Sequence, residues 1–180
     1  MQRRLEGRRI AVLVADGFED LEFWVPVMRL REEGALVTVA GMHADERLTG
    51  KNGLVITTEA TIGELDDTWD AVVVPGGWAP DKLRRYEVVT GLVRRTHERG
   101  AIVGLICHAG LVGISAGIVA GGRATGSLGI KDDLVNAGAT WTDEAAFRDG
   151  NVVWGRVVED IPDFCRELVE AIADAPQEKR

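Results

Sequence analysis

Short apolar runs alternate with segments of helical periodicity along most of the chain. The runs at residues 10–15, 71–74 and 102–106 consist almost wholly of Val, Ile, Leu and Ala, as in strands buried on both faces of a sheet. The other expected elements are strands at 37–40, 54–58 and 152–153, and helices at 26–33, 87–99, 109–120, 131–137 and from Pro162 onward. We therefore predict an α/β fold with a mainly parallel sheet and helices on both faces.

The size and charge of the chain limit the classes of protein to which it can belong. A length of 180 residues fits one domain, residues 1–180, with a polar tail at 174–180. The 21 basic and 29 acidic side chains give a net charge of −8, which opposes a nucleic-acid partner because nucleic-acid binders present basic patches. Cys107 and Cys165 are too few for a disulfide framework, and the first ten residues contain no signal-like apolar run. We therefore expect a cytoplasmic protein.

One uncharged stretch competes with that interpretation. Residues 101–120 contain no Asp, Glu, Lys or Arg, and by length alone they could span a membrane. Gly104, the Cys107-His108 pair and Gly110 divide the stretch into a strand-sized piece and a helix-sized piece. We therefore predict a buried strand and helix, and no membrane segment.

Three unusual segments each follow a predicted strand. They are ADGFEDLE at 15–22, PGGWAPDK at 75–82 and CHAG at 107–110. In open parallel sheets, ligands bind beyond the carboxyl ends of the strands. We therefore expect the three segments to converge there and to carry the chemistry of the protein.

Cys107 lies between an apolar strand and an apolar helix, with small residues directly after it. This pattern is typical of a nucleophile elbow, in which a tight turn projects a reactive side chain from the sheet edge. A following helix N-terminus would lower the pKa of the thiol, so the pattern predicts a reactive thiolate. The alternative is a buried structural cysteine.

The residues around Cys107 each have a functional and a structural interpretation. His108 could act as a general base or only bond nearby backbone. Gly77 could turn its N–H toward a developing oxyanion or simply end a strand. Asp81 could orient a histidine or cap the next helix. Glu19 and Glu22 could lie beside the sulfur or favour the helix dipole from a short turn before the first helix.

The sequence predicts neither a metal nor a cofactor. Three His and two distant Cys show no metal-ligand spacing. His43 lies in an expected loop and His97 on a charged helix face, so neither receives a chemical role. Cys165, within an amphipathic final helix, is expected to be inert core.

Five separated motifs carry a family resemblance. They are DGFEDLE at 16–22, VVVPGGWAPDKLR at 72–84, LICHAGLVGISAG at 105–117, IKDDLVNAGATWTDE at 130–144 and DFCRELV at 163–169. Over about residues 8–172 the chain resembles the ThiJ/PfpI superfamily, most closely its PfpI-type intracellular-protease branch. The resemblance implies a flavodoxin-like α/β sandwich that forms a homodimer or a higher oligomer.

The resemblance also implies roles for single residues. Cys107 matches the family's nucleophile and His108 its neighbouring histidine. Glu22 matches the acid that contacts the sulfur, and Glu19 a second acid nearby. Asp81 matches an acidic position that reaches from a neighbouring subunit to complete a Cys-His-acid triad.

The resemblance extends to the oxyanion-binding pair, Gly77 and the backbone of His108, but the pocket departs from it. The chain has CHAGL where the branch usually has CHG followed by Pro and a polar residue. Ser127-Leu128 replaces an aromatic-Pro pair, and the late SR-x-P motif appears as Gly155-Arg156-Val157-Val158. These differences leave the elbow in place and change the expected substrate pocket.

Together, the matches predict a stress-related cysteine hydrolase or lyase that acts on a carbonyl centre of a small molecule or peptide. Peptidase, deglycase and glyoxalase-like activities all fit, with the Cys107 thiolate as nucleophile and His108 moving protons. One alternative is a non-enzymatic oxidation sensor whose Cys107 sulfinate is stabilised by Glu22. Another is an isonitrile-hydratase-like enzyme of the same superfamily.

Overall fold

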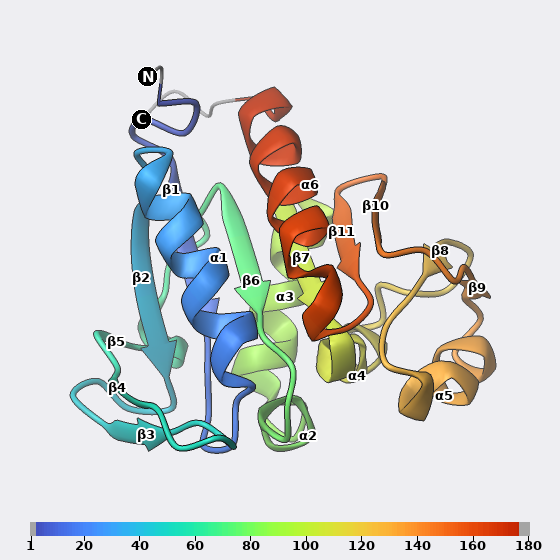
Figure 1. The fold of residues 1–180 in the computed structure, drawn as a ribbon, viewed down its shortest axis with the longest axis horizontal. Coiled ribbons are helices and arrows are strands. Elements are labelled where there is room, and N and C mark those ends of the chain that lie inside the picture. The colour runs from blue at the N-terminus through green and yellow to red at the C-terminus, as the bar shows by residue number, and fades with distance from the viewer. Residues whose placement is uncertain (1–2, 177–180) are drawn as a thin grey trace.

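A single large sheet organises the molecule, and helices cover both of its faces (Figure 1). The computed structural model describes residues 3–176. The strand order is β10-β11-β7-β6-β1-β2-β5, and only β10 and β11 pair antiparallel. The strands are β1 (Arg9–Leu13), β2 (Leu36–Gly41), β5 (Ala60–Thr61), β6 (Ala71–Val74), β7 (Ile102–Ile106), β10 (Ala146–Asp149) and β11 (Val152–Gly155). The predicted mainly parallel sheet is confirmed.

Alternating strand residues feed two apolar cores, one on each face of the sheet. In β1, Ile10 and Val12 join the core under one helix layer, and Ala11 and Leu13 join the other core. The first layer consists of α1 (Asp20–Glu32) and α6 (Ile161–Asp174). The second core is lined by α2 (Ala79–Leu83), α3 (Glu87–Glu98), α4 (Gly110–Ala116) and α5 (Lys131–Asn136). Because both faces are covered, the central strands are apolar throughout.

The first helix begins earlier than the sequence predicts. We expected a helix at 26–33, with the acidic residues in a short turn before it, and that boundary is wrong. Helix α1 begins at Asp20 and contains Pro26 in its interior. Proline removes one helical hydrogen bond, but Phe23 and Val27 on either side of it are buried in the core and hold the helix against the sheet. Tertiary packing therefore outweighs the local break.

The uncharged stretch at 101–120 divides as predicted. Its first part forms β7, a 3₁₀ turn covers Cys107–Ala109, and α4 follows. Helix α4 ends at Ala116 rather than at 120, because Gly117 adopts a left-handed conformation with φ of 75°. Within residues 3–176, no helix combines the length and the apolarity that a membrane crossing requires.

Two small sheets flank the main one. The strand expected at 54–58 is β4 (Val55–Thr57), which pairs with β3 (Arg47–Thr49) in a hairpin outside the main sheet. In Figure 1 this hairpin lies at the same end of the molecule as α2. The second small sheet pairs β8 (Arg123–Ala124) with β9 (Thr140–Trp141). The sequence predicted β4, but it predicted neither its partner β3 nor the second small sheet.

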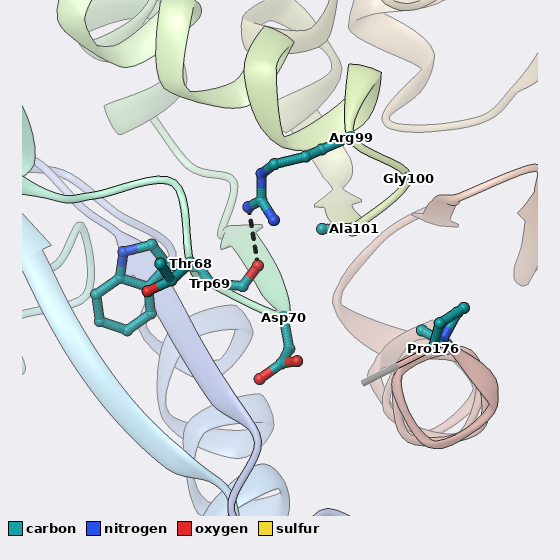
Figure 2. A pocket seen from close by; sticks show the side chains of 8 residues that line it. Thr68, Trp69, Asp70, Arg99, Gly100, Ala101 and Pro176 are labelled. Carbon is teal, nitrogen blue, oxygen red and sulfur yellow. Dashed lines mark hydrogen bonds between the residues drawn. The ribbon is translucent and has the colours of Figure 1, made fainter. Parts of the chain in front are cut away.

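A hollow of about 210 Å³ lies at the amino ends of β6 and β7 (Figure 2). Arg99 crosses it and donates a 2.9 Å hydrogen bond to the carbonyl of Trp69. Beside it, the buried Arg8 guanidinium lies 3.2 Å from Asp70 and donates to carbonyls at the end of α6. Ligands of parallel sheets bind at the opposite edge. We therefore interpret the contacts at the amino edge as structural.

Candidate active site

Cys107 stands on a strained turn at the carboxyl end of β7. Its φ is 58°, in the left-handed region that side chains other than glycine rarely adopt. The 3₁₀ turn Cys107–Ala109 leads directly from the strand into α4. The predicted elbow geometry is therefore present, with the thiol at the sheet edge.

The three segments that follow β1, β6 and β7 converge as expected. Phe18 forms an isolated antiparallel bridge with Gly77, and the Glu19 N–H donates a 3.0 Å hydrogen bond to the Gly76 carbonyl. Gly76 lies against the cysteine turn: a Cβ at this position would come within 2.8 Å of Cys107 Cβ. Only glycine permits so close an approach, so PGG is a packing requirement of the site.

Glu22 is a completely buried carboxyl in the first turn of α1. Its Oε2 accepts a 2.7 Å hydrogen bond from the Gly76 N–H. Its Oε1 is buried and makes no hydrogen bond to any residue within 3–176. Burial raises the pKa of Glu22 to about 7, and the charge of Glu19 adds to the rise, while the Gly76 hydrogen bond, Cys107 and Lys51 oppose it. Glu22 therefore titrates near neutral pH.

Cys107 is not the low-pKa thiol that the sequence predicts. Burial raises the pKa of Cys107 to about 12, and the neighbouring Glu22 charge adds to the rise, while the N–H groups of His108 and Gly77 oppose it. The expectation counted a helix N-terminus and left out the cost of burying a thiolate. Because the carboxyl and the thiol are two acids side by side, they keep at least one proton between them at neutral pH.

His108 contacts the sulfur through its ring. Its Nδ1 lies 3.3 Å from Cys107 Sγ. Burial lowers the pKa of His108, and the charge of Lys51 lowers it further, so the imidazole is neutral near pH 7. A Cβ at Gly129 would be 3.4 Å from His108 Nε2, which places the far side of the ring against the loop after β8. The adjacent side chains thus meet instead of diverging.

Gly77 supplies an N–H group that faces the cysteine sulfur together with the N–H of His108. Its φ is +79°, and a Cβ there would come within 2.5 Å of the Glu19 nitrogen and the Gly17 carbonyl oxygen. Both the conformation and the crowding require glycine. The N–H groups of Gly77 and His108 therefore both approach the sulfur, and an oxyanion-binding role for them stays a prediction.

Glu19 and Asp81 have different surroundings. Glu19 is the N-cap of α1, where its Oε2 accepts from the Glu22 N–H at 2.9 Å and its Oε1 from Asn52 Nδ2 at 3.0 Å. Asp81 is exposed within α2 and pairs with Arg85. The N-caps of α2 and of the expected next helix, α3, are Trp78 and Tyr86, so the helix-cap interpretation of Asp81 is wrong. A role for Asp81 in a neighbouring subunit stays a prediction.

A cleft of about 320 Å³ opens over the cysteine turn. Its lining comprises Glu19, Glu22, Lys51, Gly77, Trp78, Cys107, His108, Ser127, Val157, Val158 and Glu159. Two of the three sequence departures lie here: Ser127, with neighbouring Leu128 three-quarters exposed, and the Val157-Val158 pair. Lys51 and Trp78 were not predicted as cleft residues. The segment that contains Trp78 was marked by its glycines, whereas the sequence gives no signal for Lys51.

The surroundings of Cys165 differ from those of Cys107. It is 5% exposed within α6 and packs in the core under α1. Burial raises the pKa of Cys165 to about 11. Within residues 3–176, no group of three or more His, Cys, Asp or Glu side chains is placed to hold a metal ion. The slow reaction of Cys165 with alkylating reagents stays a prediction.

Comparison with known proteins identifies the family. The sequence profile described as DJ-1/PfpI family matches residues 8–171. A deglycase of Thermococcus kodakarensis is 39% identical over 165 residues, covering 91% of this chain and 99% of the relative. The protein named Deglycase PfpI of Pyrococcus furiosus is 38% identical over 165 residues, with the same coverage of 91% and 99%.

A solved structure shows the same fold. It is a two-domain protein of Anabaena variabilis with DJ-1/ThiJ/PfpI-like and ferritin-like domains, 34% identical with a TM-score of 0.90. The match covers 96% of this chain and 51% of the two-domain chain, so this chain spans about half its length. The flavodoxin-like architecture expected from the resemblance is confirmed. This chain, with its glycine-packed cysteine turn, belongs to the DJ-1/PfpI family.

Proposed function

We propose that the protein is a cysteine-dependent hydrolase or lyase that acts on a carbonyl centre through Cys107. The observation that carries the proposal is the convergence on one sulfur of two N–H groups, from Gly77 and His108, a carboxyl and an imidazole nitrogen. A nucleophile with adjacent proton acceptors and oxyanion donors is the arrangement that covalent carbonyl chemistry needs.

The proposed first step forms a bond between sulfur and carbon. Cys107 Sγ attacks the carbonyl carbon, and the C=O π electrons move to the oxygen, which the N–H groups of Gly77 and His108 stabilise. The thiol proton passes to the Glu22 carboxylate, whose pKa of about 7 suits proton exchange near neutral pH. The neutral His108 ring is the second acceptor, since its Nδ1 lies 3.3 Å from the sulfur.

The names of the relatives favour a deglycase among the three predicted activities. Proteins of Thermococcus kodakarensis and Pyrococcus furiosus bear that name, at 39% and 38% identity. We therefore rank adducts between 2-oxoaldehydes and amines or thiols first as substrates, before peptides. The cleft of about 320 Å³, bordered by Trp78 and two valines, is at the small end of the usual range of ligand pockets, which favours small adducts.

A substrate panel tests this function. Methylglyoxal, its amine and thiol adducts, and peptides are supplied to the wild type and to Cys107→Ala, with Cys165→Ala as the matched control. We expect Cys107→Ala to reduce turnover by at least about a thousandfold and Cys165→Ala to leave it unchanged. Absence of turnover by the wild type, with stoichiometric oxidation of Cys107 by peroxide, would instead support the sensor hypothesis.

We also propose that the active form is a homo-oligomer in which Asp81 of one subunit orients His108 of the next. Asp81 is exposed, and within its own chain it pairs with Arg85, so it is accessible to a second subunit. Mixing Asp81→Asn with Cys107→Ala under subunit exchange should partly restore activity, because some contacts combine an intact cysteine with an intact donor. No recovery after verified exchange would reject a shared site.

A reducing compartment suits this chemistry, and we propose that the protein works in the cytoplasm. Both Cys107 and Cys165 are free, and the proposed reaction needs Cys107 reduced. Fractionation of cells with an antibody, together with the redox state of Cys107 in rapidly acidified extracts, measures both points.

A further inference from the structure

We propose that Lys51 selects molecules that carry an anionic group, such as a carboxylate, next to the carbon that Cys107 attacks. The proposal deepens the function above and rests on it: the protein would favour acidic carbonyl compounds over neutral ones. It concerns a residue outside the predicted set, on a hairpin that contributes nothing to the main sheet.

Of the residues within 3–176 that line the cleft over Cys107 and His108, Lys51 is the one Lys or Arg. Its side chain is exposed, and within residues 3–176 its ammonium has no carboxylate within ion-pair distance. Its charge nevertheless reaches Glu22 and His108, since it lowers the pKa of both groups. The ammonium is therefore close to the reacting atoms and available to a ligand.

The loop that carries Lys51 is fixed to the start of α1. The Lys51 N–H donates to the Phe18 carbonyl at 2.9 Å. The carboxylate of Asp20, only 2% exposed, accepts hydrogen bonds of 2.8 Å from the N–H groups of Asn52 and Leu54. Gly50 allows this contact, because a Cβ there would come within 2.5 Å of Asp20 Oδ1. A buried carboxylate thus holds the backbone of the lysine loop at the cleft.

Glu19 keeps its negative charge, but within residues 3–176 no carboxylate of the cleft forms an ion pair with Lys51. Both oxygens of Glu19 already accept hydrogen bonds, and Glu22 is protonated in part near pH 7 because its pKa is raised. Glu159 is exposed and therefore well hydrated. An anionic substituent that enters beside the sulfur gains attraction from Lys51 without displacing an existing ion pair.

Two alkylating reagents that differ in charge test the proposal without any enzymatic turnover. In both, Cys107 Sγ attacks the CH₂ carbon, an S–C bond forms and iodide leaves, but iodoacetate carries a carboxylate where iodoacetamide carries a neutral amide. The measured quantity is the ratio of the two rate constants at Cys107, read by peptide mass spectrometry at fixed pH. Lys51→Arg preserves the charge, and Lys131→Met removes the same charge from a residue outside the cleft.

We expect Lys51→Met to lower the iodoacetate-to-iodoacetamide ratio about two- to fivefold, Lys51→Arg to retain most of it, and Lys131→Met to leave it unchanged. Higher salt should reduce the wild-type ratio. An equal change with both reagents would mean that Lys51 only tunes the acid–thiol pair, and would overturn the proposal. A lower ratio without carbonyl turnover refutes the proposed function alone; turnover with an unchanged ratio refutes this inference alone.

Discussion

The two edges of the main sheet bury ionisable groups in opposite ways. At the amino edge, Arg8 and Asp70 are each less than a tenth exposed and form a pair of opposite charge, 3.2 Å apart, with carbonyls around the guanidinium. At the carboxyl edge, Glu22 and Cys107 are two acids side by side, and one carboxyl oxygen has no hydrogen bond within residues 3–176. In the first arrangement each charge is balanced by its partner, whereas in the second neither acid balances the charge of the other.

The difference separates stability from reactivity. A buried pair of opposite charge is costly to break because one partner would remain charged and uncompensated. Two neighbouring acids destabilise each other when both ionise, and that conflict leaves a proton mobile near neutral pH. We infer that the amino edge holds the fold together and that the carboxyl edge gives up stability for chemistry, a trade typical of active sites.

The largest effect on the free energy of unfolding should come from removing the Arg8 guanidinium at the amino edge. Arg8→Met leaves Asp70 without its guanidinium and the end of α6 without its donor, so we expect a loss of about 3–5 kcal/mol in the free energy of unfolding. Arg9→Met is the control: its pair with Asp66 is more exposed and should contribute at most about 1 kcal/mol. Urea unfolding at pH 7 measures both, and equal losses would contradict the comparison.

The next effect concerns pH at the carboxyl edge. A carboxyl whose pKa rises from 4.5 to about 7 on folding destabilises the folded state by about 3 kcal/mol at pH 8. As the pH rises, the Glu22 carboxyl of the unfolded chain loses its proton before that of the folded chain does. The folded state therefore has its full stability below pH 4.5 and loses about 3 kcal/mol of it as the pH rises through 7. Glu22→Gln should therefore stabilise the protein at pH 8 but not at pH 4.

Glu159→Gln, which removes an exposed carboxyl from the same cleft, is the matched control for this prediction. It should follow the wild-type pH dependence of unfolding. Glu22→Gln should also speed Cys107 alkylation at pH 8, because the Glu22 charge raises the pKa of the thiol. Identical unfolding curves for Glu22→Gln and wild type at pH 8 would show that Glu22 is not strained by burial.

The strands beside the site could be predicted because their burial on both faces leaves continuous apolar runs. β6 and β7 match the expected segments 71–74 and 102–106 residue for residue. Once the sheet is known to be parallel, Gly77 and Cys107 must share an edge, since each follows one of these strands. The apolar runs thus located the cysteine turn and its glycine neighbour.

What sequence could not predict depends on contacts between distant segments. Pro26 suggested a helix start, but packing against the sheet carries α1 through it. The raised pKa of Cys107 arises from burial and from Glu22, 85 positions away in the chain. Lys51 reaches the cleft only because its loop bonds to Phe18 and Asp20. None of these contacts leaves a local pattern.

A pair of glycines compares the backbone at the two edges. Gly77 at the carboxyl edge and Gly100 at the amino edge share a φ of +79°, but a Cβ meets backbone at 2.5 Å in the first and nothing within 4 Å in the second. Gly100→Ala should cost about 1 kcal/mol from conformation alone. Gly77→Ala should cost about 1–3 kcal/mol and slow alkylation of Cys107, and equal costs would show that the carboxyl edge is not crowded.

The smallest effect on stability should come from Asp81, which tests how far the reactive edge extends within one chain. Asp81 follows β6, as Gly77 does, yet it is exposed, and within residues 3–176 its one ion pair is with Arg85, just beyond α2. An exposed helical ion pair contributes about 0.5 kcal/mol or less. Asp81→Asn should therefore leave both the unfolding curve and its pH dependence nearly unchanged at concentrations where the protein is monomeric.

A loss of more than about 1 kcal/mol, or a changed alkylation rate of Cys107 in the monomer, would place Asp81 within the coupled acid–thiol cluster of its own chain. Measured beside Glu22→Gln under the same conditions, the variant marks the boundary between groups whose charge is buried with the sulfur and groups that face solvent.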